Sequence, residues 1–209
     1  IAQDEAWYEN LDHDARKIFE TLQRNAFHMH DLLDELAEFN HLNFQGNKLE
    51  PCEVLLEKCI SEVTEGAKDL ASKKAITFTP ECNLNGFQKT IFDPMKIRRA
   101  LDNLISNAVK YSNRDTIIRL LIKANNHRLH FEIIDQGLGI PQSEFSKLFK
   151  EFGKTSVRPT ERESSSGIGL AIVKKIIEQH GGQVDVQSEV GKGSAFSFWI
   201  PLKKVASTL

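Results

Sequence analysis

The chain has 209 residues, 40% of them hydrophobic and 27% charged, so it can bury one full core and carry a smaller extension. Its net charge of −2 gives no overall attraction to polyanions, and we expect no nucleic acid partner. Three cysteines without a CxxC pair, and no apolar run near the roughly 20 residues of a membrane helix, indicate a soluble chain in a reducing, cytoplasmic compartment. Because the sequence begins at Ile1 rather than Met, we expect a piece of a longer protein, and a membrane-anchored parent stays open.

Residues 14–40 contain neither Gly nor Pro and predict one long helix. Apolar residues recur along it at alternating steps of three and four, which gives a heptad seam of about two and a half repeats. These residues are Phe19, Leu22, Ala26, Met29, Leu33 and Leu36. Such a seam needs a partner helix, either upstream in the parent protein or in a second copy of the chain. The alternative is that this apolar stripe packs onto the domain that follows.

Gly46 and Pro51 interrupt the chain, and we place a boundary between residues 1–46 and residues 47–209. In the second part, apolar spacing predicts helices at residues 52–72, from Pro94 with Asp93 as N-cap, and at residues 167–180. β-rich runs predict strands at residues 75–80, 86–92, 184–190 and 194–202, and a hairpin over residues 116–135 that turns at Asn125 and Asn126. Helices on one side of a mostly antiparallel sheet make an α/β two-layer sandwich, preceded by the long helix.

Polar residues share one face of the helix that begins at Pro94. At about 100° per residue, Asn103, Asn107 and Lys110 cluster within about 60°, away from the apolar stripe. An asparagine carbonyl is a neutral oxygen ligand for Mg²⁺, which takes few protein ligands beside substrate phosphates. The lysine ammonium adds a point charge for phosphate. The alternative is a solvated helix face.

The string DQGLGI follows a predicted strand, so Asp135 lies at a strand end. Gly137 and Gly139 allow a tight turn and close approach of a ligand. An ionised aspartate accepts hydrogen bonds and cannot donate them, which matches the amino group of adenine rather than the carbonyl of guanine. Taken alone, the string is also compatible with an ordinary turn.

A polar stretch follows Phe149 and Phe152, which we expect to be hydrophobic anchors, and few of its residues can be buried. It ends at Gly167, Ile168, Gly169 and Leu170, where a helix begins. A glycine-rich helix start presents free backbone N–H groups and the positive end of the helix dipole, which favour a bound phosphate.

In chain order the sequence carries NLISNAVKY, DQGLGI, a loop that starts at two phenylalanines, GIGLAIVKK and GKGSAFSF. This combination closely resembles the catalytic ATP-binding domain of sensor histidine kinases, in the wider ATPase superfamily that includes gyrase and MutL. The motifs cover residues 75–202, and residues 14–50 resemble the second helix of the kinase dimerisation hairpin and its linker. The resemblance implies a Bergerat fold with ATP and Mg²⁺ as cofactors.

The same resemblance implies roles for single residues. Adenine would lie at Asp135, Mg²⁺ would be bound through Asn107, and Asn103 and Lys110 would serve catalysis near the phosphates. The full set expected to contact the nucleotide is Asn103, Asn107, Lys110, Tyr111, Asp135, Gly137, Gly139, Ile140, Phe152, Lys154, Gly167, Ile168, Gly169, Leu170 and Ser194.

By this resemblance residues 153–166 form a lid, in which Lys154 and Arg158 are candidate cations or solvated surface residues. We call residues 153–166 the lid segment. The implied partners are ATP or ADP, a dimerisation helix of the same protein or of a second copy, and the receiver domain of a response regulator.

Asn103 also bears on the type of reaction. In the gyrase and MutL branches a glutamate at this place activates water, and an amide cannot act as a general base. Asp102 lies about 100° around the helix and should not substitute for it. Transfer of the phosphoryl group to an outside acceptor is therefore favoured over sustained hydrolysis.

The family's acceptor is a histidine followed by Asp or Glu on the first dimerisation helix. Of the seven histidines, only His13 partly matches, and too little chain follows it for a complete helical hairpin. We therefore predict the ATP-binding catalytic part of a sensor histidine kinase whose acceptor is not identifiable in this chain. The alternatives are a nucleotide-binding regulatory module with degenerate or absent autokinase activity, and a serine-directed kinase of the anti-sigma type.

Overall fold

The computed structural model describes residues 11–44, 48–125, 127–161, 163 and 166–203. Its elements in chain order are helix α2 (His13–Phe44), strand β1 (Cys52–Leu55), helix α3 (Leu56–Ser72), strands β2 (Thr77–Asn83) and β3 (Lys89–Phe92), helix α4 (Pro94–Tyr111), strands β4 (Ile117–Ala124) and β5 (Arg128–Ile134), the 3₁₀ helix η1 (Gln142–Lys147), helix α5 (Gly169–Gln179), and strands β6 (Gln183–Glu189) and β7 (Gly193–Pro201).

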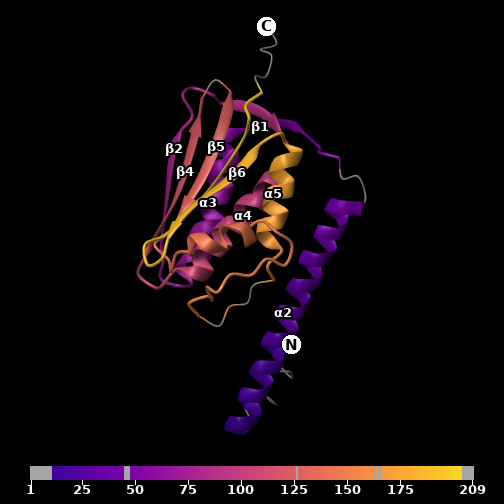
Figure 1. Ribbon diagram of the computed structural model, residues 1–209, viewed down its shortest axis with the longest axis vertical. Coiled ribbons are helices and arrows are strands. Elements are labelled where there is room, and N and C mark those ends of the chain that lie inside the picture. Colours follow the sequence, from indigo (N-terminus) through magenta and orange to yellow (C-terminus); the bar gives the residue numbers. More distant parts are fainter. Residues whose placement is uncertain (1–10, 45–47, 126, 162, 164–165, 204–209) are drawn as a thin grey trace.

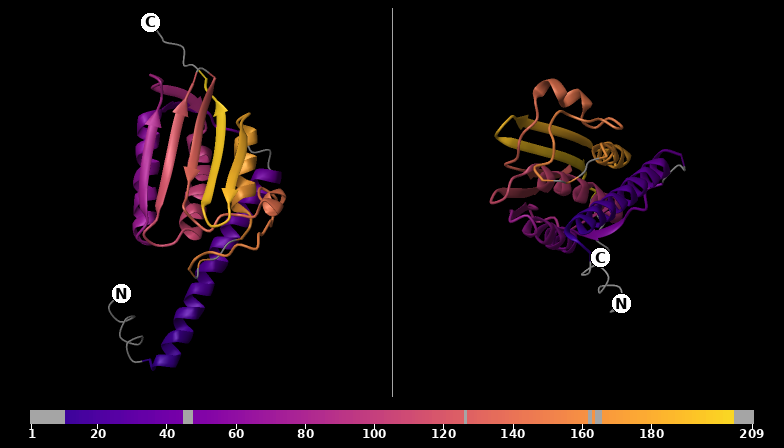
Figure 2. Two further views of the ribbon diagram at one scale, coloured as in Figure 1. Left: turned by 60° about the vertical axis from the view of Figure 1, so that its left-hand side comes forward. Right: turned by 90° about the horizontal axis from the view of Figure 1, so that it is seen from below.

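Five strands form one sheet in the order β2-β4-β5-β7-β6, in which β2 and β4 are parallel and the other neighbours are antiparallel. Helices α3, α4 and α5 cover one face of this sheet (Figures 1 and 2). The burial of the strands alternates accordingly: in β4, Ile118, Leu120 and Ile122 are buried, whereas Arg119 and Lys123 are exposed. The predicted two-layer α/β sandwich is confirmed.

A second, small sheet corrects the prediction at residues 52–72. Its first four residues form β1, which pairs antiparallel with β3, so the helix begins at Leu56 rather than at Cys52. Val54 is buried in this pair, and the N–H of Leu56 donates to the carbonyl of Gln88. A partner more than thirty positions away in the sequence decides the conformation of these four residues, so helical periodicity alone did not reveal the strand.

Local signals identified α4 and the β4–β5 hairpin correctly. The carboxylate of Asp93 accepts a hydrogen bond from the N–H of Lys96 and caps α4, and Pro94 occupies the first helical position. At the hairpin turn, the side-chain oxygen of Asn125 accepts from the N–H groups of His127 and Arg128. Asn126, the other predicted turn residue, lies outside the described residues.

Helix α2 extends away from the sandwich and contacts it at α5 (Figure 1). Its heptad stripe faces solvent: Leu22, Met29 and Leu33 are each more than 60% exposed. The alternative that this stripe packs onto the following domain is therefore wrong in this structure. Among the described residues, none of the helices has both the length and the apolar character that a membrane span requires.

Candidate functional site

A pocket that is open to solvent lies between α4, the loop after β5, the lid segment and β7. Its walls include Asn107, Tyr111, Asp135, Gly139, Ile140, Lys154, Gly167, Gly169, Leu170 and Ser194 from the set expected to contact the nucleotide, and the candidate lid cation Arg158. The four sequence motifs and the loop among them therefore all contribute residues to one cavity. The expected residues that do not line it are Asn103, Lys110, Gly137, Phe152 and Ile168.

Asp135 lines the pocket just after β5 and is only 5% exposed. Its Oδ1 atom accepts hydrogen bonds from the N–H groups of Gly137 (2.8 Å) and Ser194 (3.1 Å), so Oδ2 is the atom that can accept from a ligand. Burial raises the pKa of Asp135 to about 6, although the two backbone hydrogen bonds oppose the shift. Near neutral pH the pocket therefore presents a buried acceptor.

The three polar residues on one face of α4 have different surroundings. Asn107 lines the pocket. Asn103 lies one turn earlier and donates through Nδ2 to the carbonyl of Arg99, while its Oδ1 lies 2.8 Å from the place a Cβ would take at Gly169. A side chain at Gly169 would therefore collide with Asn103, which explains the glycine there. The backbone carbonyl of Lys110 accepts a hydrogen bond from the N–H of Thr160. Lys110 itself does not line the pocket.

The donors at this face fit Mg²⁺ bound together with a polyphosphate. Asn107 offers a neutral amide oxygen at the wall of the pocket. Across the part of the chain that the structure describes, no group of three or more His, Cys, Asp or Glu residues could hold an ion by itself. A cation here would need ligands from its substrate, and Mg²⁺ commonly binds in this way, keeping several waters and taking one or two protein oxygens beside phosphate.

The lid segment begins and ends at neighbouring points of the pocket. A Cβ at Gly167, whose φ is +79°, would lie 3.1 Å from the carbonyl oxygen of Gly153. Between these glycines, the backbone N–H and the hydroxyl of Ser156 both donate to Glu144 of η1. Lys154 and Arg158 line the pocket on either side of this contact, so positive side chains face the cavity from the lid.

Phe152 corrects an expectation. Its side chain is 60% exposed and its backbone has a positive φ of 56°, so it is not a hydrophobic anchor. Phe149 is the anchor: it is partly buried against the core, and its ring packs edge to face on Phe196 at 6.3 Å. Ile168, another expected contact, is 3% exposed and belongs to the hydrophobic core.

Several pocket residues were not foreseen from the sequence. Leu148, Thr155, Val157 and Phe196 line the cavity, as does the additional cation Lys150. Phe196 could have been found, because it belongs to the inward-facing set of an alternating strand. The others lie in irregular backbone, where no periodicity assigns a direction to a side chain.

The start of α5 and the surroundings of Asn103 bear on the chemistry. No side chain caps the N-terminus of α5, which begins at Gly169 on the wall of the pocket. Its first N–H groups and the helix dipole favour an anion there. Asp102, the carboxylate next to Asn103, pairs with Arg98 on the exposed side of α4 and does not line the pocket.

Comparison with known proteins agrees with this geometry. Residues 92–204 match the family described as histidine kinase-, DNA gyrase B-, and HSP90-like ATPase. The circadian input-output histidine kinase CikA of Synechococcus elongatus is 28% identical over 188 residues, covering 89% of this chain and 25% of that protein. The aerobic respiration control sensor protein ArcB of Escherichia coli is 27% identical over 197 residues, covering 94% of this chain and 25% of that protein.

Among solved structures, full-length ShkA in complex with AMPPNP superposes with a TM-score of 0.79 at 26% identity, covering 95% of this chain and 41% of that one. The chain spans about a quarter of the length of the curated relatives CikA and ArcB.

Proposed function

The chain belongs to the histidine kinase-, DNA gyrase B-, and HSP90-like ATPase family, and from that membership we propose that it binds ATP with Mg²⁺ and presents the γ-phosphoryl group to a histidine on a dimerisation helix. The relatives CikA and ArcB are a histidine kinase and a sensor protein, and the ShkA structure contains the ATP analogue AMPPNP. We also propose that the chain divides near residue 46 into a dimerisation part and the catalytic domain.

The observation that carries this proposal is that a buried carboxylate and several cations line one pocket. The carboxylate is Asp135, just after β5, and the cations are Lys154 and Arg158 of the lid segment and Lys150 shortly before it. ATP has complementary groups, because its adenine carries an amino group that donates hydrogen bonds and its triphosphate is strongly anionic. Complementary charges of this kind fix the direction in which a ligand binds.

In this mechanism the side chains orient the nucleotide and neutralise the charge of its phosphates. Oδ2 of Asp135 accepts from the adenine amino group, and the uncapped start of α5 and the lid cations hold the phosphate oxygens. Asn107 would offer its amide oxygen to Mg²⁺, and the ion would neutralise part of the negative charge of the triphosphate. The nucleophile comes from the acceptor histidine, so the domain itself needs no general base.

Net ATP hydrolysis is not the proposed purpose. Asn103 cannot remove a proton from water, and Asp102 is engaged with Arg98 away from the pocket. A regulatory module that binds nucleotide without transferring phosphate would use the same pocket, and the experiment below separates the two.

The partners follow from the same reasoning. The exposed heptad stripe of α2 supports pairing with a dimerisation helix, either of the same protein or of a second copy. A response regulator receiver domain is the proposed final acceptor of the phosphoryl group. Three free cysteines and the use of ATP support the cytoplasm as the compartment.

The test is phosphotransfer from radiolabelled ATP to a separately supplied dimerisation hairpin that carries an acceptor histidine. We expect acid-labile, alkali-stable phosphohistidine that depends on Mg²⁺. Tight ATP binding without phosphohistidine would favour the regulatory module, and absence of ATP binding would overturn both.

A further inference from the structure

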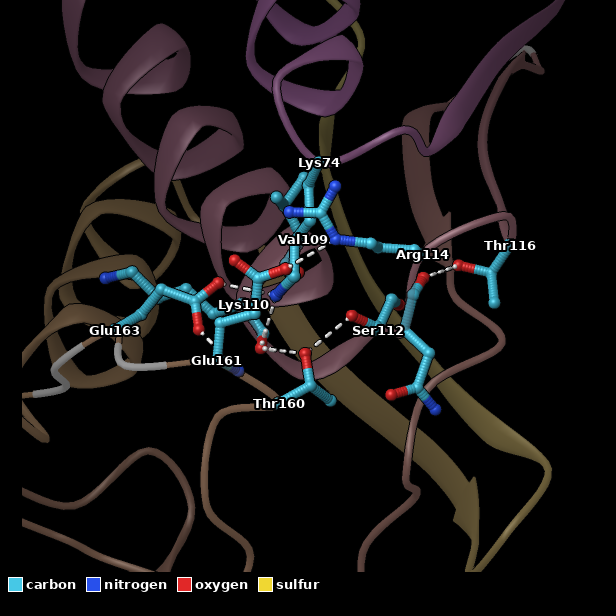
Figure 3. Close-up of polar contacts among 10 residues, drawn as sticks. Lys74, Val109, Lys110, Ser112, Arg114, Thr116, Thr160, Glu161 and Glu163 are labelled. Carbon is cyan, nitrogen blue, oxygen red and sulfur yellow. Dashed lines mark hydrogen bonds and ion pairs between the residues drawn. The ribbon is translucent and has the colours of Figure 1, made fainter.

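Lys74, a buried lysine just after α3, lies outside the pocket and has no role in the mechanism above. Lys74 is only 5% exposed. Its Nζ atom donates to the carbonyl oxygens of Val109 (3.0 Å) and Lys110 (3.2 Å), in the last turn of α4 (Figure 3). The last carbonyls of a helix lack partners within the helix and carry partial negative charge, so an ammonium there is favourable. Lys74 therefore holds the end of the helix that carries Asn107.

The third partner of this ammonium is Glu163, from the lid segment (Figure 3). The ion pair is mostly shielded from water, since the two side chains are 6% and 25% exposed. Close by, the N–H of Thr160 donates to the carbonyl of Lys110 (3.0 Å), and its hydroxyl donates to that of Ser112 (2.8 Å). We call Lys74, Thr160 and Glu163 the lid anchor.

A neighbouring ion pair serves as an internal comparison. Arg114 pairs with Glu161, also in the lid segment, at 3.0 Å, but these side chains are 60% and 42% exposed. Exposed pairs contribute little because water and salt screen them, whereas removing one partner of a shielded pair leaves a charge without compensation. Of the two contacts, the one at Lys74 is therefore expected to fix the lid.

The lid anchor connects the two walls that would enclose the phosphates. Asn107 lies one turn before Lys110 on α4, and Arg158 lies two positions before Thr160 in the lid segment. Both residues line the pocket. Their separation thus depends on how firmly the lid is held against the end of α4. A second contact, between Ser156 and Glu144, holds the other part of the lid.

We propose that Lys74 is a positioning residue for the nucleotide's phosphates, because its ammonium couples the last turn of α4 to the lid segment through Glu163. This inference rests on the proposed function, in which the lid closes over the triphosphate of ATP. Lys74 touches no reacting atom in this role. It sets the place from which Lys154 and Arg158 reach the phosphates.

The test compares the variants Glu163→Gln and Glu161→Gln of the full chain, each titrated with MgATP and with adenosine by calorimetry. Adenosine has no phosphates and reports the contact with Asp135, whereas the triphosphate of MgATP also reports the cations of the lid segment. We expect Glu163→Gln to weaken MgATP binding about 10-fold while adenosine binding is retained. The matched control Glu161→Gln should change neither affinity by more than about twofold. Unchanged MgATP affinity in Glu163→Gln, or an equal loss for adenosine, would overturn the inference.

A second pair of variants separates positioning from a purely structural role. Lys74→Met alone leaves the carboxylate without its partner, and Lys74→Met combined with Glu163→Gln removes both charges. We expect the double variant to regain thermal stability relative to Lys74→Met, while its MgATP affinity stays as low as that of Glu163→Gln. Recovery of affinity together with stability would overturn the positioning role.

If Lys74→Met does not fold, the comparison of Glu163→Gln with Glu161→Gln decides the question. A wild-type chain that binds neither MgATP nor adenosine would overturn the proposed function itself. A wild-type chain that binds both ligands, with a Glu163→Gln variant indistinguishable from it, would overturn only the lid anchor.

Discussion

Burial raises the pKa of the Asp135 carboxyl group well above the ordinary value for an aspartate. Because Oδ1 already accepts from two backbone N–H groups, a proton would be carried by Oδ2, which would then present a donor instead of an acceptor to the adenine amino group. Because burial raises its pKa to about 6, we predict that adenosine affinity falls as the pH drops through about 6 and is level above that range. Adenosine is the right probe because it has no phosphate that titrates in this range. Calorimetric titration across this range measures the effect.

The variant Asp135→Asn is the control for this pH dependence. Its amide presents a donor as well as an acceptor, so adenosine should bind more weakly and discrimination between ATP and GTP should decrease. The affinity that remains should no longer change near pH 6. A variant that kept both the wild-type affinity and its pH profile would remove Asp135 from the adenine site.

Asn107 is the side chain that we expect to bind Mg²⁺. We expect Asn107→Ala to lower Mg²⁺-dependent ATP affinity by at least about 10-fold without lowering the stability of the fold, since the side chain lines an open pocket rather than the core. The matched control is Asp102→Ala on the exposed side of the same helix. Calorimetry with and without Mg²⁺ measures both variants. An equal response of the two would argue against a metal ligand at position 107.

Motifs in the sequence were sufficient to find Asn107, Asp135 and Gly169, because short spacings carry the chemistry of a helix face, a strand end and a helix start. They could not find Lys74. A lysine in the pair KK at the end of a helix is typical of solvated surface, and its partners lie 35 and 89 positions along the chain. Burial of this ammonium results from tertiary packing, which leaves no periodic signal in the sequence.

At the scale of elements, the helices were predictable because each carries an apolar stripe of helical period, and the capping residues of α4 fixed its start. The short strands were less predictable. Residues 52–55 become β1 through pairing with β3, and η1 is a six-residue 3₁₀ helix whose Glu144 accepts hydrogen bonds from Ser156 of the lid segment. Both depend on contacts that form only when distant segments meet, so a local reading of the sequence misses them.

Among the described elements, helix α2 depends most on a partner for its stability. Its seam residue Leu33 is 63% exposed, and a stripe of that kind is stabilised when it is buried against another helix. We predict that the chain associates through α2 and that Leu33→Asp shifts it toward the monomer and lowers the helix content. Analytical ultracentrifugation and circular dichroism measure these effects. Lys17→Glu, which changes charge on the opposite side of α2, is the control and should behave as wild type.

At the scale of the whole molecule, His180 joins the two helices that carry the site. Its Nδ1–H donates to the carbonyl of Ile176 in the last turn of α5, and its Nε2 accepts from the N–H of Asp93, the N-cap of α4. Asp93 in turn accepts from the N–H of Glu50, just before β1. One neutral imidazole thus connects the end of α5, the start of α4 and the segment that leads into the domain.

This arrangement predicts how stability changes with pH. Burial lowers the pKa of His180, so the unfolded chain binds its proton more readily than the folded chain. The stabilisation that the neutral His180 ring provides is therefore complete above the unfolded pKa of about 6.5 and is lost as the pH falls below it. The pH dependence of stability that Asp135 contributes has the opposite sign. Its folded-state pKa is raised to about 6, so its contribution to stability is present at low pH and is lost as the pH rises through that value.

A comparison of variants isolates His180, because Asp135 contributes equally to each protein. We predict that His180→Gln lowers the free energy of unfolding by about 1 kcal/mol above the unfolded pKa, and that this deficit shrinks as the pH falls and the wild-type imidazole becomes protonated. Urea denaturation over that range measures it. The control His127→Gln alters an exposed side chain at the β4–β5 turn and should show no pH-dependent difference. A deficit for His180→Gln that stayed constant with pH would mean that the ring contributes only by packing. The hydrogen bonds of the neutral imidazole would then not be what connects α4 to α5.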